Sequence, residues 1–148
     1  MSLYYEEIEV GHSRDCGSVT VTREDLLSFA EQFDPQPIHT DPEAAAESMY
    51  GGLIASGWHT AALSARLLVE GFMNETASLG GRGMDDLRWH APVRPGDTLS
   101  VEVEVLDKEP DDRNPGMGHT RVGVTTTTDD GETVLTMVGL GLVERRGD

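Results

Sequence analysis

An acid and a base lie five residues apart in the segment Phe33-Asp34-Pro35-Gln36-Pro37-Ile38-His39. Each proline fixes its own φ angle and disfavours the α conformation in the residue before it. Asp34 and Gln36 are therefore expected to be extended, and Asp34 and His39 to lie on a stiff turn. A stiff turn that carries a carboxylate and an imidazole can direct two proton-transfer groups at one atom. The segment is a candidate site of general acid–base chemistry.

The two Asp-Pro pairs of this region also have a purely structural interpretation. Asp34-Pro35 is typical of a helix end. Asp41-Pro42 is typical of a helix start, with Asp as the N-cap and Pro at the first helical position. On residue types alone, this structural interpretation is favoured over the catalytic one.

Metal binding is a weaker alternative for the same region. The candidate ligands are Asp34, His39, Asp41 and His59. Their spacing matches no zinc pattern, so no metal and no other cofactor is predicted. His59 is expected to be a hydrogen-bonded core residue, with a place in the wall of a pocket as the alternative. The remaining histidines belong to no motif and are His12, His90 and His119.

The composition predicts one domain over residues 1–148. A chain of 148 residues with 37% hydrophobic content is long enough for a single core. No apolar run reaches membrane-spanning length, and the first residues lack the pattern of a signal peptide. Cys16 is the single cysteine, so it forms no internal disulfide and is interpreted as a small hydrophobic residue. We expect a cytoplasmic protein.

The charge is strongly negative. There are 27 acidic residues against 11 Lys and Arg, a formal net charge of −16, and Lys108 is the single lysine. Such a surface repels nucleic acid and anionic membranes, so neither is expected as a partner. The pattern resembles proteins of salt-loving organisms, in which molar salt screens self-repulsion. The alternative is an acidic protein from a high-GC genome that uses arginine in place of lysine.

The N-terminal half predicts helices after one short strand. The pattern of residues 18–22 predicts a short strand. Thr22 then caps a helix whose apolar residues at helical spacing are Leu26, Leu27, Ala30 and Phe33. A short helix follows over 43–49. The longest helix covers 57–73 and is apolar or small around most of its circumference, so we expect a sheet to wrap it.

The C-terminal half predicts strands. Apolar and polar residues alternate over 99–105, which is typical of a strand with one wet face. Further strands are predicted over 84–91, 119–128 and 132–144, with Asp129-Asp130-Gly131 as a hairpin turn. Residues 107–118 have the composition of a loop. The result is an α+β protein with a mostly antiparallel sheet around one long helix.

Three segments together resemble the MaoC-like dehydratases, a family that includes (R)-specific enoyl-CoA hydratases. The first is Asp34-Pro35-Gln36-Pro37-Ile38-His39-Thr40-Asp41, and the second is Gly52-Leu53-Ile54-Ala55-Ser56-Gly57-Trp58. The third is Arg88-Trp89-His90-Ala91-Pro92-Val93-Arg94-Pro95-Gly96-Asp97-Thr98-Leu99. The resemblance covers nearly the whole chain. It implies a hot-dog fold, in which a curled antiparallel sheet wraps a long central helix.

The resemblance also implies a reaction and its residues. Asp34 and His39 would handle one water, adding it to a 2-enoyl-CoA or removing it from a 3-hydroxyacyl-CoA. The backbone N–H of Gly57 would face the thioester oxygen, where enolate charge develops. The further substrate-binding candidates are Gln36, Ser56 and Trp58, with Arg88 and Arg94 for the anionic end of CoA. A third arginine, Arg82, lies near these two in sequence.

Two residues depart from the family pattern. Gln36 replaces an Asn, and Ala65 stands where some members carry a Ser, with Ser64 adjacent but on another side of the helix. The alternatives to hydration are therefore a hot-dog acyl-CoA thioesterase and a non-catalytic acyl-CoA-binding protein. Because an isolated hot-dog sheet has open edges, the resemblance also implies a homodimer or a multiple of dimers.

Overall fold

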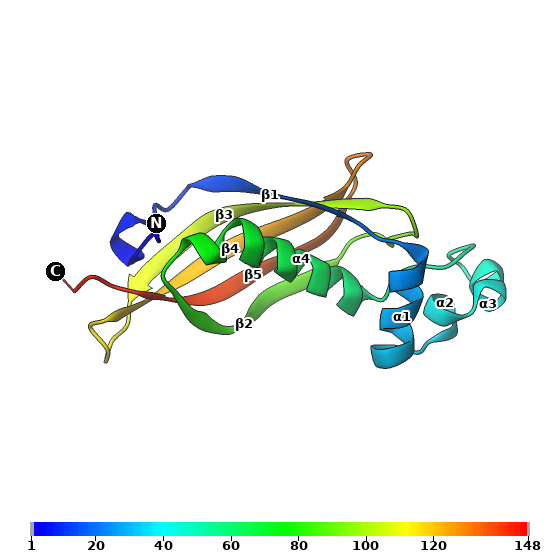
Figure 1. The fold of residues 1–148 in the computed structure, drawn as a ribbon, viewed down its shortest axis with the longest axis horizontal. Coiled ribbons are helices and arrows are strands. Elements are labelled where there is room, and N and C mark those ends of the chain that lie inside the picture. The colour runs from blue at the N-terminus through cyan, green and yellow to red at the C-terminus, as the bar shows by residue number, and fades with distance from the viewer. Residues whose placement is uncertain (1, 148) are drawn as a thin grey trace.

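Five antiparallel strands make one sheet in the computed structural model, which describes residues 2–147. The strands are β1 (Ser13–Thr20), β2 (Ser78–Trp89), β3 (Thr98–Pro110), β4 (Met117–Thr128) and β5 (Thr133–Glu144). Their order across the sheet is β1-β3-β4-β5-β2, so β1 and β2 are the edges. The sheet curls around the helix α4 (Gly57–Gly71), which lies along one of its faces (Figure 1). This is the hot-dog architecture that the resemblance implies.

The alternating pattern of β3 builds much of the core. Leu99, Val101, Val103 and Val105 are each at most 1% exposed, whereas the glutamates between them are exposed. Each such side chain contributes roughly 1.5–3 kcal/mol when it is buried rather than exposed. Cys16 in β1 is buried in the same core, and burial raises the pKa of its thiol. Its interpretation as a small hydrophobic residue is therefore confirmed.

Only one side of α4 is buried in the single chain. Its buried residues are His59, Thr60, Ser64, Leu67 and Leu68. The opposite side carries Ala62 and Val69, which are exposed. The prediction of a helix wrapped by the sheet is confirmed for the inner side. The outer side is mixed, because the exposed ion pair of Arg66 and Glu70 lies beside Ala62 and Val69.

Three short helices gather at one end of the sheet, beside the start of α4 (Figure 1). They are α1 (Arg23–Phe33), α2 (Pro37–Thr40) and α3 (Pro42–Glu47). The capping predictions are confirmed, because Thr22 Oγ1 accepts from Asp25 N–H and Asp41 Oδ1 accepts from Glu43 N–H. Single 3-10 turns precede β1 (Tyr5–Glu7) and follow α4 (Met73–Glu75). The two ends of the described chain meet at the other end of the molecule.

Three element boundaries differ from the sequence predictions. The strand expected over 18–22 is β1, which begins at Ser13 and bulges between Asp15 and Ser18. The strand expected over 84–91 is β2, which begins at Ser78. The loop expected over 107–118 shrinks to residues 111–116, because β3 and β4 pair as far as Pro110 and Gly118. The first residues of β4 also pair with β5, so this extension is three-stranded. Its polar residues lie in strands that composition alone does not predict.

No helix among the described residues is long and apolar enough to cross a membrane.

Candidate active site

Asp34 and His39 are positioned by two different helices. Asp34 is the C-cap of α1, where its N–H donates to Ala30 O. Gln36 is extended as predicted, but Asp34 is not (φ −155°, ψ 70°). The prediction of one stiff turn is wrong at His39, which lies in the helix α2. Pro37 explains this, because it occupies the first position of α2 with its φ already suited to a helix.

His39 is buried and has a defined tautomer. Its Nδ1 lies 2.8 Å from the carbonyl oxygen of Ile54. A carbonyl oxygen accepts only, so Nδ1 carries the hydrogen in the neutral ring. Nε2 then carries the lone pair of the ring, and it lies 3.4 Å from Asp34 Oδ2. This separation exceeds the usual length of an N–H···O bond. The two atoms therefore lie beside each other without a close direct bond.

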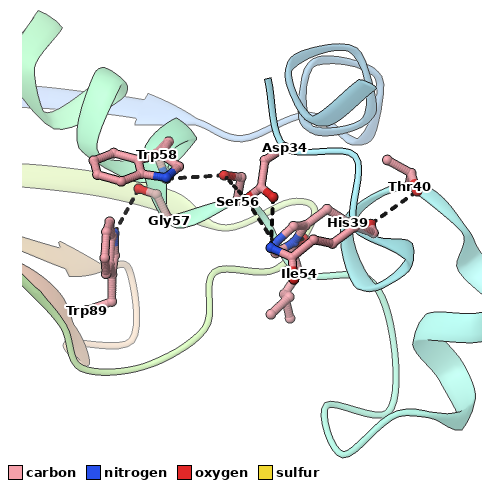
Figure 2. A network of polar contacts seen from close by, with 9 residues as sticks. Asp34, His39, Thr40, Ile54, Ser56, Gly57, Trp58 and Trp89 are labelled. Carbon is pink, nitrogen blue, oxygen red and sulfur yellow. Dashed lines mark hydrogen bonds and ion pairs between the residues drawn. The ribbon is translucent and has the colours of Figure 1, made fainter. Parts of the chain in front are cut away.

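Asp34 is held by two side-chain donors. Gln36 Nε2 donates to Oδ1 at 2.8 Å. Ser56 Oγ donates to Oδ2 at 2.7 Å (Figure 2). These two hydrogen bonds lower the pKa of Asp34, with Gln36 as the larger cause. Partial burial acts in the opposite direction. Asp34 is therefore a carboxylate at neutral pH.

Nearly all of the first backbone N–H groups of α4 donate hydrogen bonds within the protein. Ser56 is its N-cap, and Trp58 N–H donates to Ser56 Oγ at 3.2 Å. The N–H groups of His59 and Thr60 donate to Ser56 O. Within residues 2–147, no acceptor is found for Gly57 N–H. A free amide at a helix start favours an oxyanion, because the helix dipole adds to its positive potential.

These groups surround one cavity of about 550 Å³, which we call the Asp34 cavity. Five predicted site residues line it: Asp34, Gln36, His39, Gly57 and Trp58. Ser56 is fully buried behind them and contacts Asp34. The cavity brings a carboxylate, an imidazole lone pair and a free amide to one space, which is the set that proton transfer next to a carbonyl needs.

The predicted arginines lie outside this wall. Arg88 is exposed, and its guanidinium donates to the adjacent Leu87 O. Arg94 is half-buried, and its guanidinium lies near Gly52. Neither is among the residues that line the Asp34 cavity. Their predicted contact with the anionic end of CoA remains a prediction.

Sequence reasoning missed several residues of the cavity wall, above all Trp89, His90 and Tyr50. Trp89 Nε1 donates to Gly57 O at 2.8 Å, and its ring meets Trp58 edge-on at 5.2 Å. His90 Nε2 lies 2.7 Å from Thr136 Oγ1. No local pattern predicts the Trp89 contact, because it joins residues 32 positions apart in the sequence.

The remaining candidates belong to the core. His59 stacks on Phe29 at 4.6 Å, and burial lowers its pKa, so it is neutral. Its Nδ1 has no hydrogen-bond partner in the described chain, unlike the core histidine that we expected. Ser64 points into the sheet and contacts Thr126 Oγ1 at 2.7 Å. The residues that the structure describes contain no cluster of three metal-ligand side chains.

A model of the MaoC like domain matches residues 7–128, which is most of the chain. The chain belongs to the MaoC-like dehydratase family. A crystal structure of a MaoC-like dehydratase from Rhodospirillum rubrum superposes with a TM-score of 0.91. The two sequences are 39% identical, and the match covers 98% of this chain and 99% of the Rhodospirillum rubrum chain. This similarity of a whole domain agrees with the hot-dog fold described above.

Curated relatives of this MaoC-like protein cover about three quarters of it. Protein YdeM of Bacillus subtilis is 39% identical over 106 residues, which are 71% of this chain and 74% of YdeM. The 3-hydroxybutyryl-CoA dehydratase of Methylorubrum extorquens is 34% identical over 116 residues, 75% of this chain and 69% of that enzyme. At family level, these similarities support hydratase or dehydratase activity on acyl-CoA thioesters.

Proposed function

We propose that this protein is a hydratase/dehydratase that interconverts a 2-enoyl-CoA and a 3-hydroxyacyl-CoA. The observation that carries the proposal is the convergence of the Asp34 carboxylate, the His39 Nε2 lone pair and the free Gly57 amide on one cavity. The dehydratase named among the relatives acts on a thioester of this class.

A single water is the reactant that Asp34 and His39 are suited to hold. Asp34 is ionised and His39 Nε2 is a lone pair, so both are acceptors 3.4 Å apart. A water molecule can donate one O–H to each of them. Its own lone pair then faces the cavity, which is the orientation that attack on an alkene carbon requires.

The reaction then needs one proton-transfer pair and one oxyanion donor. The water oxygen bonds to C3, its proton passes to His39, and the π electrons move to the thioester oxygen. The Gly57 N–H would stabilise the resulting enolate charge. The Asp34/His39 pair returns a proton to C2, which restores the thioester carbonyl. Asp34 stabilises the imidazolium between these two steps, and dehydration is the reverse sequence.

The direct test follows the absorbance of the conjugated enoyl thioester of crotonyl-CoA in molar KCl. We expect wild type to remove this absorbance without releasing free thiol. Asp34→Asn is expected to lower kcat/KM by ~10³-fold, within the range for loss of a general acid–base group. We also propose the (R) configuration for the product, and chiral analysis of the 3-hydroxybutyryl product tests it.

The controls separate the alternative functions. Free thiol from wild type would identify a thioesterase. Acyl-CoA binding without turnover, measured by thermal shift, would identify a non-catalytic binding protein. If wild type fails on crotonyl-CoA, longer and branched enoyl-CoAs are assayed next. Failure on all of them in folded protein would refute the proposed function.

We further propose that the protein works as a homodimer. Among the described residues, β2 pairs only with β5, so its other edge is open, and Leu79 and Met84 on this strand are exposed. The outer side of α4 adds the exposed apolar residues Ala62 and Val69 beside the Arg66–Glu70 ion pair. A second copy would satisfy the open edge and cover these side chains. Light scattering in molar salt is the test, and a monomer would contradict this proposal.

A further inference from the structure

A continuous line of hydrogen bonds joins the edge strand β2 to Asp34. Trp89 Nε1 donates to Gly57 O at 2.8 Å. This carbonyl shares a peptide group with Trp58 N–H, which donates to Ser56 Oγ at 3.2 Å. Ser56 Oγ in turn donates to Asp34 Oδ2 at 2.7 Å (Figure 2). Trp89 is thus the outermost donor of a line that ends on the proposed catalytic carboxylate.

The two peptide groups beside Gly57 are both held. Trp89 and Ser56 bind the carbonyl and the amide of the following peptide group. The preceding carbonyl, Ser56 O, accepts from the N–H groups of His59 and Thr60. A glycine has few steric limits of its own, so these partners determine where its N–H points. Of these partners, Trp89 is the one that does not belong to the helix start.

The fit between Trp89 and Gly57 is also close in space. A Cβ atom at position 57 would lie 2.5 Å from the Trp89 indole, which is shorter than any allowed contact. The indole therefore lies directly against the glycine. Trp58 meets Trp89 edge-on at an interplanar angle of 85°, which limits the indole from another side.

We infer that Trp89 is a positioning residue that directs the Gly57 amide and, through Ser56, the Asp34 carboxylate. The inference rests on the proposed function and extends it to a residue of the edge strand. Trp89 needs no proton-transfer role, because the indole N–H donates to a backbone carbonyl and not to the substrate. Its loss should lower the rate of the chemical step more than the affinity for substrate.

The first experiment measures hydration by Trp89→Phe, which keeps an aromatic ring at this position and removes the N–H donor. We expect kcat to fall about tenfold, the size expected for one lost hydrogen bond, while KM changes less than about twofold. The matched control is Asp85→Asn on the same strand, which removes the ion pair with Arg121. This control should keep wild-type kcat. An unchanged kcat in Trp89→Phe would overturn the inference.

A double-mutant cycle separates positioning from general damage. Ser56→Ala breaks the same line at its other end. If both substitutions act through that line, the kcat loss in the Ser56→Ala/Trp89→Phe double variant is smaller than the product of the single losses. A loss equal to the product would mean that Trp89 acts independently of the line, and the inference would be wrong.

A readout that needs no turnover keeps the two proposals distinguishable. The backbone amide resonances of Gly57 and Trp58 should shift in Trp89→Phe, and Trp58 N–H should exchange faster with solvent. They should stay in place in Asp85→Asn. If wild type hydrates no thioester, the proposed function fails, and the exchange rate of Trp58 N–H shows whether Trp89 holds the helix start, because loss of the indole ring current shifts both resonances in any case. An unchanged exchange rate in Trp89→Phe would overturn the inference.

Discussion

Two aspartate–histidine pairs occur among the described residues, one beside the start of α4 and one at the turn between β3 and β4. These two places lie at opposite ends of the fold (Figure 1). Asp34 and His39 lie beside the start of α4, with 3.4 Å between Oδ2 and Nε2. Asp111 and His119 lie at the turn between β3 and β4, with 2.7 Å between Oδ1 and Nε2. Both pairs have an oxygen of a carboxylate next to Nε2 of an imidazole, so residue types do not distinguish them.

The surroundings distinguish the two pairs. Asp111 accepts the backbone N–H groups of Arg113 and Asn114, and its remaining bond goes directly to His119. No reacting atom fits between these partners. Asp34 and His39 instead line a cavity and lie too far apart for a close direct bond. If the proposed function holds, a gap that opens onto a cavity marks the reactive pair, and direct contact marks the structural one.

The largest expected difference between the pairs is in activity. His39→Asn should lower kcat/KM for enoyl-CoA hydration by ~10³-fold, because it removes the proposed base. The matched variant His119→Asn should keep kcat/KM within about twofold, because that end of the molecule lies away from the cavity. The enoyl-thioester absorbance assay measures both. Comparable losses in the two variants would refute the distinction.

Each end also has a glycine beneath an aromatic ring, and this gives the next largest effect. A Cβ atom at Gly57 would collide with Trp89, and one at Gly118 would collide with Tyr5. Gly57→Ala and Gly118→Ala should each reduce the free energy of unfolding by about 1–3 kcal/mol, as overpacking does. Chemical denaturation measures both losses. Only Gly57→Ala should also lower kcat of the folded protein, and equal kcat losses would contradict the assignment.

A smaller effect concerns the pH at which Asp34 is ionised. Gln36 is the largest cause of the lowered pKa of Asp34, so Gln36→Leu should raise that pKa. The measurement is the carbon-13 NMR titration of the Asp34 carboxyl carbon, because the acid limb of the kcat/KM–pH profile also depends on the neutral His39 ring that the mechanism needs. An unmoved or lowered pKa of Asp34 would contradict the role of this hydrogen bond.

The smallest effect is the pH dependence of stability at the other pair. Hydrogen bonds from His119 and from two backbone amides lower the pKa of Asp111 from 3.8 to about 2. Its stabilising effect is therefore complete at neutral pH and disappears as the pH falls through this range. Asp111→Asn should melt below wild type at pH 7, with a gap that narrows from pH 4 to pH 2. A gap of constant size would contradict this.

The parts of the fold that follow local rules could be predicted from the sequence. Thr22 and Asp41 cap α1 and α3 as expected, and the alternation in 99–105 faces the core. The extent of β3 and β4 could not be predicted, because the pairing of Pro110 with Gly118 depends on the partner strand. Phe33 was expected on the buried side of α1 but is 67% exposed, because α1 ends at the rim of the fold.

The sequence predicted the proposed reactive groups of the site, but it did not predict the residues that hold them in place. The family motif placed Asp34, His39 and Gly57 together, and the structure brings all three to one cavity. The Trp89 contact joins residues 32 positions apart and depends on where β2 ends. His90 lies in the cavity wall for the same reason. Such contacts depend on which distant segments the fold brings together, so no local sequence pattern predicts them.

The meeting of Trp58 and Trp89 gives this protein an optical property that needs no label. They are the two tryptophans of the chain, both are about half exposed, and both line the Asp34 cavity. Indole emission responds to the polarity around the ring, so nearly all of the fluorescence of this protein originates at the cavity. Ligand binding in the cavity changes the wavelength or the intensity of this emission. Stopped-flow fluorescence can therefore measure the rate of binding before the chemical step.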